Sequence, residues 1–133
     1  MRRFLLICCG GALGTGGRYL LSGWIAQAYG TGFPLGTLLV NLSGSFLITL
    51  IMEFSLSGGA ISPNTRFFLT TGVMGGYTTY SSFNYESLML ASHGAVGVAA
   101  LYMGLTAGGA LVAGFLGLAA ARAVLGLGAR LAG

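Results

Sequence analysis

Charged side chains are scarce in this sequence, and neither lysine nor aspartate occurs. Only 6% of the 133 residues are charged, and the only side-chain carboxylates are those of Glu53 and Glu86. A chain that is 55% hydrophobic with so few charges cannot present a charged, soluble surface. The 25 glycines are typical of membrane helices. The composition therefore predicts an integral membrane protein of one domain, residues 1–133. The six arginines form no basic stripe, so nothing favours binding to nucleic acid.

Cysteine and histidine are also too few to build a metal or redox centre. Cys8 and Cys9 are adjacent within an apolar run, and this spacing gives neither a CxxC site nor a disulfide framework. We expect two buried, inert thiols. His93 lies in a predicted loop, where a solvated histidine is the ordinary case. No cluster of carboxylate, histidine or cysteine offers a catalytic acid, base or transition-metal site, so we expect a protein that is not an enzyme.

Long apolar stretches, separated by short turns, predict an all-α membrane protein with four transmembrane helices. The predicted spans are residues 4–27, 34–57, 66–91 and 95–125. The N-terminus begins like a signal peptide, but its apolar run continues without a convincing cleavage site, so we expect an uncleaved first span. Turn residues occupy the gaps at 30–34, 57–64 and 92–94, with Asn64 as the expected N-cap of the third span.

The third predicted span is interrupted by small and polar residues. Its middle carries Gly75-Gly76, Thr78-Thr79 and Ser81-Ser82, which weaken a helix or offer its backbone other partners. We therefore predict a break at residues 75–79, near mid-membrane. Irregular backbone at that depth survives only where protein or a water-filled path covers it, so a break implies a site. The alternative is tight packing of small residues against a neighbouring helix.

Other spans carry features that fit the same depth. Gly10 and Gly14 are four residues apart in the first span and predict a close-approach face. Arg18 lies well inside the same apolar stretch, where a charge is costly, so we expect it to face an aqueous vestibule. The alternative is an arginine that reaches the lipid headgroups. In the second span Thr37 and Asn41 share one helical face with Gly44 and Ser45.

The polar groups expected near mid-membrane are neutral, and most of them donate hydrogen bonds. Taken singly, an asparagine more often joins helices, and a tyrosine can anchor at the interface. Together with the arginines, such donors suit an anion. The electropositive edge of Phe83, one turn from Tyr80, could contact a small anion without a fixed charge that would trap it. These candidate polar groups are Asn41, Thr79, Ser81, Ser82, Tyr102 and Thr106.

Three segments closely resemble the signatures of the Fluc/CrcB family of fluoride channels. They are Gly10-Gly-Ala-Leu-Gly-Thr-Gly-Gly-Arg18-Tyr19, Gly36-Thr-Leu-Leu-Val-Asn41-Leu-Ser-Gly44-Ser-Phe46 and Gly75-Gly-Tyr-Thr-Thr-Tyr-Ser-Ser-Phe83. The resemblance spans three helices in order. It implies passive export of fluoride across the bacterial plasma membrane, which protects the cell from fluoride trapped inside it. It also implies an antiparallel, dual-topology homodimer with two narrow pathways.

The resemblance also implies roles for individual residues. Arg18 would attract anions at the vestibule. The backbone carbonyls of Gly75 and Thr78 would bind a structural Na⁺ on the dimer axis, where two chains supply four neutral oxygens. The residues implied to line the fluoride pathway are Asn41, Thr79, Tyr80, Ser82, Phe83, Tyr102 and Thr106.

Two features depart from the family pattern. The third motif has Tyr80 where the family usually has phenylalanine. The arginines outside the first motif also gather on one side of a four-span arrangement, which is the ordinary positive-inside bias rather than the balance that a dual-topology chain requires. These arginines are Arg2, Arg3, Arg66, Arg122 and Arg130.

Two other membrane functions compete with the channel. A small proton-coupled exporter would need a carboxylate deep in the first span, and this span has none. A non-transporting assembly subunit would have no use for Asn41, Thr79 and Tyr102 at membrane depth. Sequence therefore favours the channel over both.

Overall fold

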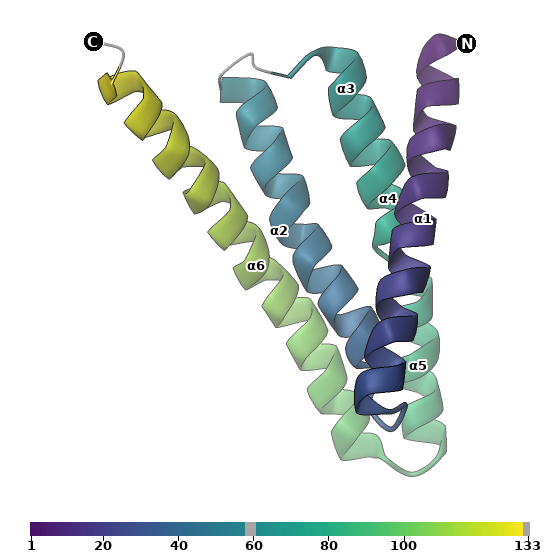
Figure 1. Ribbon diagram of the computed structural model, residues 1–133. Helices are drawn as coiled ribbons and strands as arrows, with labels where there is room; N and C mark the ends of the chain where they lie inside the picture. The colour runs from purple at the N-terminus through teal and green to yellow at the C-terminus, as the bar shows by residue number, and fades with distance from the viewer. Residues whose placement is uncertain (58–60, 132–133) are drawn as a thin grey trace.

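The computed structural model describes residues 1–57 and 61–131, and within these ranges all regular secondary structure is helical. This confirms the all-α prediction. Part of the second predicted turn, residues 58–60, lies outside the described residues. In chain order the helices are α1 (Arg2–Tyr29), α2 (Leu35–Ser57), α3 (Pro63–Phe67), the π-helix η1 (Phe68–Met74), α4 (Gly75–Tyr77), α5 (Tyr80–Ser92) and α6 (Val96–Leu131) (Figure 1).

Among the described residues, three helical segments are long and apolar enough to cross a membrane. They are Arg2–Tyr29, Leu35–Ser57 and Val96–Gly126, and they match the predicted spans 4–27, 34–57 and 95–125 to within a few residues. The remaining predicted span, 66–91, is divided among α3, η1, α4 and α5, and each of these pieces is shorter than a full crossing.

The helices form a V-shaped bundle (Figure 1). Helix α2 lies between α1 and α6, and α6 diverges from it towards the C-terminus. The most extensive packing joins α2 to α6 and α1 to η1. The start of α1, the start of α3 and the end of α6 lie at one end of the bundle, whereas the α1–α2 and α5–α6 connections lie at the other.

Glycines let α1 approach η1 closely, as the spacing of Gly10 and Gly14 predicts. A Cβ atom added at Gly10 would lie 2.6 Å from the carbonyl oxygen of Phe68, and one at Gly14 would collide with the carbonyl of Val73. Both glycines are buried. The packing of the first half of the interrupted span therefore depends on the absence of side chains in α1.

The expectation of buried thiols is wrong, because Cys8 and Cys9 are both exposed. The face of α1 that packs against η1 is the glycine face of Gly10 and Gly14, and the two cysteines lie outside it.

The predicted N-cap is also wrong. Ser62 caps α3, since its hydroxyl oxygen accepts a hydrogen bond from the amide of Thr65 at 3.2 Å and Pro63 occupies the first turn. Asn64 instead accepts a hydrogen bond from Nε of Arg3 at 3.0 Å.

Candidate functional site

The helical backbone is interrupted at Thr78 and Thr79, between α4 and α5. Both residues are extended, with φ and ψ of −77° and 156° at Thr78 and −149° and 116° at Thr79. The break is narrower than the predicted 75–79, because Gly75 and Gly76 remain helical. The threonine pair interrupts the backbone, and the glycine pair serves packing, since a Cβ at Gly76 would collide with the carbonyl of Gly11.

The side chain of Asn41 in α2 holds this break. Its Nδ2 donates to the carbonyl of Thr79 at 3.0 Å, and its Oδ1 accepts from the amide of Thr79 at 2.8 Å. Both side chains are buried. The Thr79 hydroxyl then caps α5 by accepting from the amide of Ser82 at 3.2 Å. Unpaired backbone groups are costly in an apolar interior, and here the amide and carbonyl of Thr79 are both satisfied by one side chain.

Neighbouring residues of α2 shape the same region. Ser43 Oγ lies 2.9 Å from the hydroxyl of Tyr77, the last residue of α4. Gly44 leaves room for the side-chain methyl group of Thr78, which a Cβ at that position would strike. The predicted polar and small face of the second span is therefore the surface on which the break rests.

The break also frees two backbone carbonyls. In a continuous α-helix, the carbonyl of Gly75 would accept from the amide of Thr79, and that of Thr78 from the amide of Ser82. These amides instead donate to Asn41 Oδ1 and Thr79 Oγ1. The two carbonyls predicted as cation ligands are thus among those that lose their helical donors at the break.

A cavity of about 310 Å³ opens between α2, the break and α6. It brings together five of the predicted pathway residues: Asn41, Thr79, Tyr80, Phe83 and Thr106. The Thr106 hydroxyl is buried and has no hydrogen-bond partner within the part of the chain that the structure describes. A donor beside the cavity is thus left for a ligand.

A row of aromatic rings in contact with one another extends from this cavity into the bundle. The ring centroid of Phe83 lies 5.6 Å from that of Tyr80 and 5.3 Å from that of Tyr102, with interplanar angles of 58° and 60°. Phe33 packs edge-on against Tyr102 at 5.5 Å. Phe33 lies in the predicted turn at 30–34, and its position in the sequence gives no sign of this contact. The tilted rings do not stack face to face, and ring edges are the electropositive part of an aromatic side chain.

A second cavity of about 490 Å³ contains two further predicted residues, Arg18 and Ser82. Nε of Arg18 donates to the carbonyl of Gly76 at 3.2 Å. The arginine thus lines a cavity and is anchored to the interrupted span. Thr79 lines both cavities, so the break lies where they approach each other.

Glu86 joins three helices, a role that its position near the end of a predicted span does not suggest. Its Oε1 accepts from the hydroxyl of Thr37 in α2 at 2.8 Å, and its Oε2 accepts from the hydroxyl of Tyr102 in α6 at 2.7 Å. Both donors are buried, and Tyr102 is 0% exposed. The signal was present in the spacing, because Glu86 lies one helical turn after Phe83 and Ser82.

Chemically, the site consists of neutral donors, ring edges, one guanidinium and one hydrogen-bonded carboxylate around two cavities. Within the described residues, no group of three or more His, Cys, Asp or Glu side chains could hold a metal ion. Uncharged amide and hydroxyl donors can replace the water around a small anion without binding it permanently. The arrangement therefore suits passage of an anion.

Comparison with known proteins gives concordant matches. A family model described as CrcB-like protein, Camphor Resistance (CrcB), matches residues 5–118. The chain is 57% identical over 115 residues to a protein of Anaeromyxobacter sp. (strain K), which covers 86% of this chain and 91% of the relative. It is 44% identical over 125 residues to a protein of Rhizobium meliloti (strain 1021), and the match covers 94% of this chain and 100% of the relative. Identity to a Thermus thermophilus protein is 51% over 102 residues, and the match covers 77% of this chain and 80% of the relative. Each relative is named fluoride-specific ion channel FluC.

Proposed function

The chain belongs to the CrcB family, and from this premise we propose that it is a fluoride-selective ion channel. It is a multi-pass bacterial membrane protein, through which fluoride leaves the cell down its own gradient. One observation carries the proposal beyond the family name. Polar residues from separate motifs meet at one cavity, where Asn41, Thr79, Phe83 and Thr106 all contribute to the wall.

The pathway begins at the cavity that contains Arg18, whose guanidinium attracts anions. Thr79 and Ser82 lie next along the wall, followed by the ring edges of Phe83 and by the Thr106 hydroxyl, which has no partner among the described residues. Neutral donors replace the water that fluoride loses, and fluoride is a stronger hydrogen-bond acceptor than the larger chloride ion. Selectivity for fluoride follows from this narrow set of donors.

Release of the ion requires that its binding stays weak. Glu86 contributes to this balance, because its carboxylate lines the cavity of Arg18. The hydroxyls of Thr37 and Tyr102 hold this negative charge in place. A fixed negative charge beside the path opposes accumulation of anions that Arg18 would otherwise retain.

Four membrane crossings and an antiparallel homodimer complete the proposal. The third crossing consists of α3, η1, α4 and α5, with its break at mid-membrane. Several surfaces support a second copy. Among the described residues, nothing lies within 4 Å of a Cβ at Gly104 or Gly108. Tyr80 is 79% exposed although it lines the first cavity. An apolar cavity of about 530 Å³ between α2 and α6 offers a further surface for the second copy.

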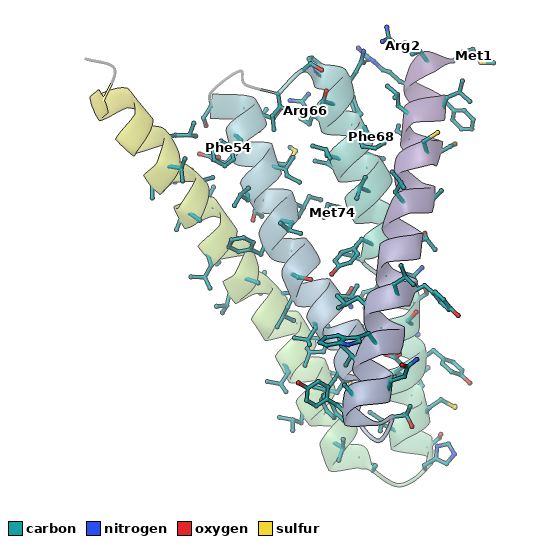
Figure 2. The ribbon with its side chains drawn as sticks, viewed as in Figure 1. Met1, Arg2, Phe54, Arg66, Phe68 and Met74 are labelled. Atoms are coloured by element: carbon teal, nitrogen blue, oxygen red, sulfur yellow. The ribbon has the colours of Figure 1, made fainter. Side chains whose placement is uncertain are left out.

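Arginine placement argues for a single orientation and makes topology a necessary measurement. Met1, Arg2 and Arg66 lie at one end of the bundle (Figure 2). The side chain of Arg130 lies outside the described residues. Single cysteines placed on opposite ends of the bundle should cross-link between chains in an antiparallel dimer. Links between like ends alone, with uniform labelling from one side of the membrane, would overturn dual topology.

A structural Na⁺ fits the freed carbonyls of Gly75 and Thr78. Two carbonyls from each of two chains provide four neutral oxygens, which suit a hard monovalent cation. The bound ion would compensate these oxygens for their lost helical donors. Because backbone oxygens are the ligands, Thr78→Ala should largely keep the ion, whereas Gly75→Val should lose assembly or activity. Equal tolerance of both changes counts against a site built from backbone.

Fluoride flux from liposomes tests the function directly. The protein is reconstituted into vesicles that contain fluoride or chloride. An ion-selective electrode then measures release of the anion after an outward gradient of that anion is imposed. We expect rapid fluoride efflux and strong exclusion of chloride. Efflux equal to that of empty vesicles would indicate a non-transporting subunit, and flux that requires a proton gradient would indicate a proton-coupled exporter. Either outcome, or comparable chloride leakage, refutes the proposal.

A further inference from the structure

Three arginines at one end of the bundle have no carboxylate to pair with. The chain contains only two acidic side chains. Glu53 pairs with Arg122 at 2.9 Å, and Glu86 accepts hydrogen bonds within the site described above. No acidic side chain is therefore left for Arg2, Arg3 and Arg66. Their positive charge must be balanced from outside the described chain.

Two of these charges contact the same aromatic ring. The guanidiniums of Arg3 and Arg66 lie 5.6 and 5.8 Å from the centroid of the same ring, that of Phe67. Arg3 is also fixed by its hydrogen bond to Asn64. Contact with one aromatic ring attracts both cations, but the ring has no net negative charge and neutralises neither of them. Such an arrangement favours an anion nearby.

A cavity of about 340 Å³ lies beside this cluster, between the first turns of α1 and α3. Its upper level is polar and consists of Arg2, Ser62, Asn64 and Thr65. One helical turn deeper its wall is apolar and consists of Leu6 and Phe68 (Figure 2 labels Arg2 and Phe68). Because Arg3 donates to Asn64 Oδ1, the amide nitrogen of Asn64 remains available as a second donor.

We propose that this cavity binds the headgroup of an anionic phospholipid, with the phosphate at Arg2 and Asn64 and beside Arg3, which donates to Asn64. Basic pockets between membrane helices, near the membrane surface, bind lipids of this kind. The polar residues of the cavity wall are followed, one helical turn along, by apolar residues. This sequence of polar and apolar lining fits a lipid better than a soluble phosphate. The start of an acyl chain would lie against Leu6 and Phe68. The bound lipid would join α1 to the first part of the interrupted span.

Binding of individual lipids to the purified, delipidated protein tests the proposal. Native mass spectrometry measures the bound fraction during titration with phosphatidylglycerol or, separately, with phosphatidylcholine. We expect one tightly bound phosphatidylglycerol per chain and at least about tenfold weaker binding of phosphatidylcholine. Because one surface arginine contributes about fivefold to such binding, Arg2→Gln and Arg3→Gln should each weaken it by about that factor. Arg2→Lys, which keeps the charge, should stay within about twofold of the parent chain.

Arg122→Gln is the matched control, because it removes the same charge on the neighbouring end of α6, where Glu53 already pairs with it. It should change lipid binding less than about twofold. Equal binding of the two lipids, or an equal loss in Arg122→Gln and Arg2→Gln, overturns the proposal. Glycerol phosphate added at the same concentration distinguishes the two sources of phosphate. If it displaces the lipid completely, the site is one for soluble phosphate and the lipid assignment is wrong.

Discussion

Replacing Asn41 by leucine is the sharpest test of how the break is held. Leucine has the same number and branching of side-chain heavy atoms as asparagine and is the larger of the two, so the substitution leaves no cavity. It removes both hydrogen bonds to Thr79, which measure 3.0 and 2.8 Å. The amide and the carbonyl of Thr79 would then be buried without partners, because the adjacent helices cannot supply replacements at an extended residue.

The expected cost follows from these two groups. A buried backbone donor or acceptor left unsatisfied costs about 1–3 kcal/mol, so the pair costs about 2–6 kcal/mol. Even the lower limit raises the population of locally opened states about thirtyfold. Asn41→Leu should therefore unfold at lower temperature, expose the Thr79 amide to exchange at least about thirty times faster, and abolish most fluoride efflux.

Thr49→Val provides a matched control on the same helix. Its hydroxyl lies within hydrogen-bond distance of the carbonyls of Ser45, Phe46 and Gly114 and can donate to one of them at a time. All three carbonyls lie within helices that supply them with backbone donors. Loss of this hydroxyl should therefore cost less than about 1 kcal/mol and leave the exchange of Thr79 unchanged.

Hydrogen exchange of the Thr79 amide, thermal unfolding in detergent and efflux from liposomes are measured on the same three proteins. A structural role for Asn41 is refuted if the Thr79 amide of Asn41→Leu exchanges its hydrogen at the parent rate and the variant keeps the parent stability. That role is also refuted if Thr49→Val and Asn41→Leu lose stability equally, because the cost would then reflect any polar residue in α2. Lost efflux with normal exchange would assign Asn41 to the ion and deny it the structural role.

Three further predictions concern other parts of the site. Tyr80→Phe keeps the ring edge and removes a hydroxyl that would hold fluoride, so fluoride turnover should rise by up to about tenfold. Tyr80→Ile removes the ring edge and should slow turnover sharply. Equal fluoride efflux through the two variants would refute a role for the ring edge at this position. Glu86→Gln removes the charged acceptor of the hydrogen bonds from Thr37 and Tyr102 and should lower the free energy of unfolding by about 1–3 kcal/mol. An unchanged denaturation curve would contradict a stabilising role for Glu86. Gly14→Ala places a methyl group against the carbonyl of Val73 and should destabilise by about 1–3 kcal/mol. Gly16→Ala meets nothing within 4 Å and should stabilise α1 by up to about 1 kcal/mol, so thermal unfolding that ranks the two glycines alike refutes the packing argument.

The sequence predicts most of the helical framework because membrane spans are set by long apolar runs. Three predicted spans match helices in the structure closely, and the fourth corresponds to the interrupted segment. The existence of a break also follows from local composition. Its position does not, because Gly75-Gly76 is the stronger local helix breaker and yet stays helical. The deciding contact comes from Asn41, which is 38 residues away from Thr79 in the chain.

Glu86 illustrates the same limit for the site. A carboxylate near the end of an apolar run is ordinary in a membrane protein, and its sequence neighbours do not reveal its ligands. Thr37 lies 49 residues before it and Tyr102 lies 16 residues after it. Only the convergence of α2, α5 and α6 gives both carboxylate oxygens a donor. The π-helix Phe68–Met74 was likewise not foreseen, since a wider helical turn has no characteristic residue pattern.

The second and third motifs are best understood as two parts of one structure. Asn41 supplies the hydrogen bonds that Thr79 loses by leaving the helix, and Gly44 supplies the space that Thr78 occupies. Ser43, between them, contacts the hydroxyl of Tyr77 at 2.9 Å. Each of these residues compensates for one consequence of interrupting a helix inside a membrane: unpaired backbone, a displaced side chain and a helix end. A substitution in the second motif should therefore disturb conduction by moving the third, even where its own side chain never meets the ion.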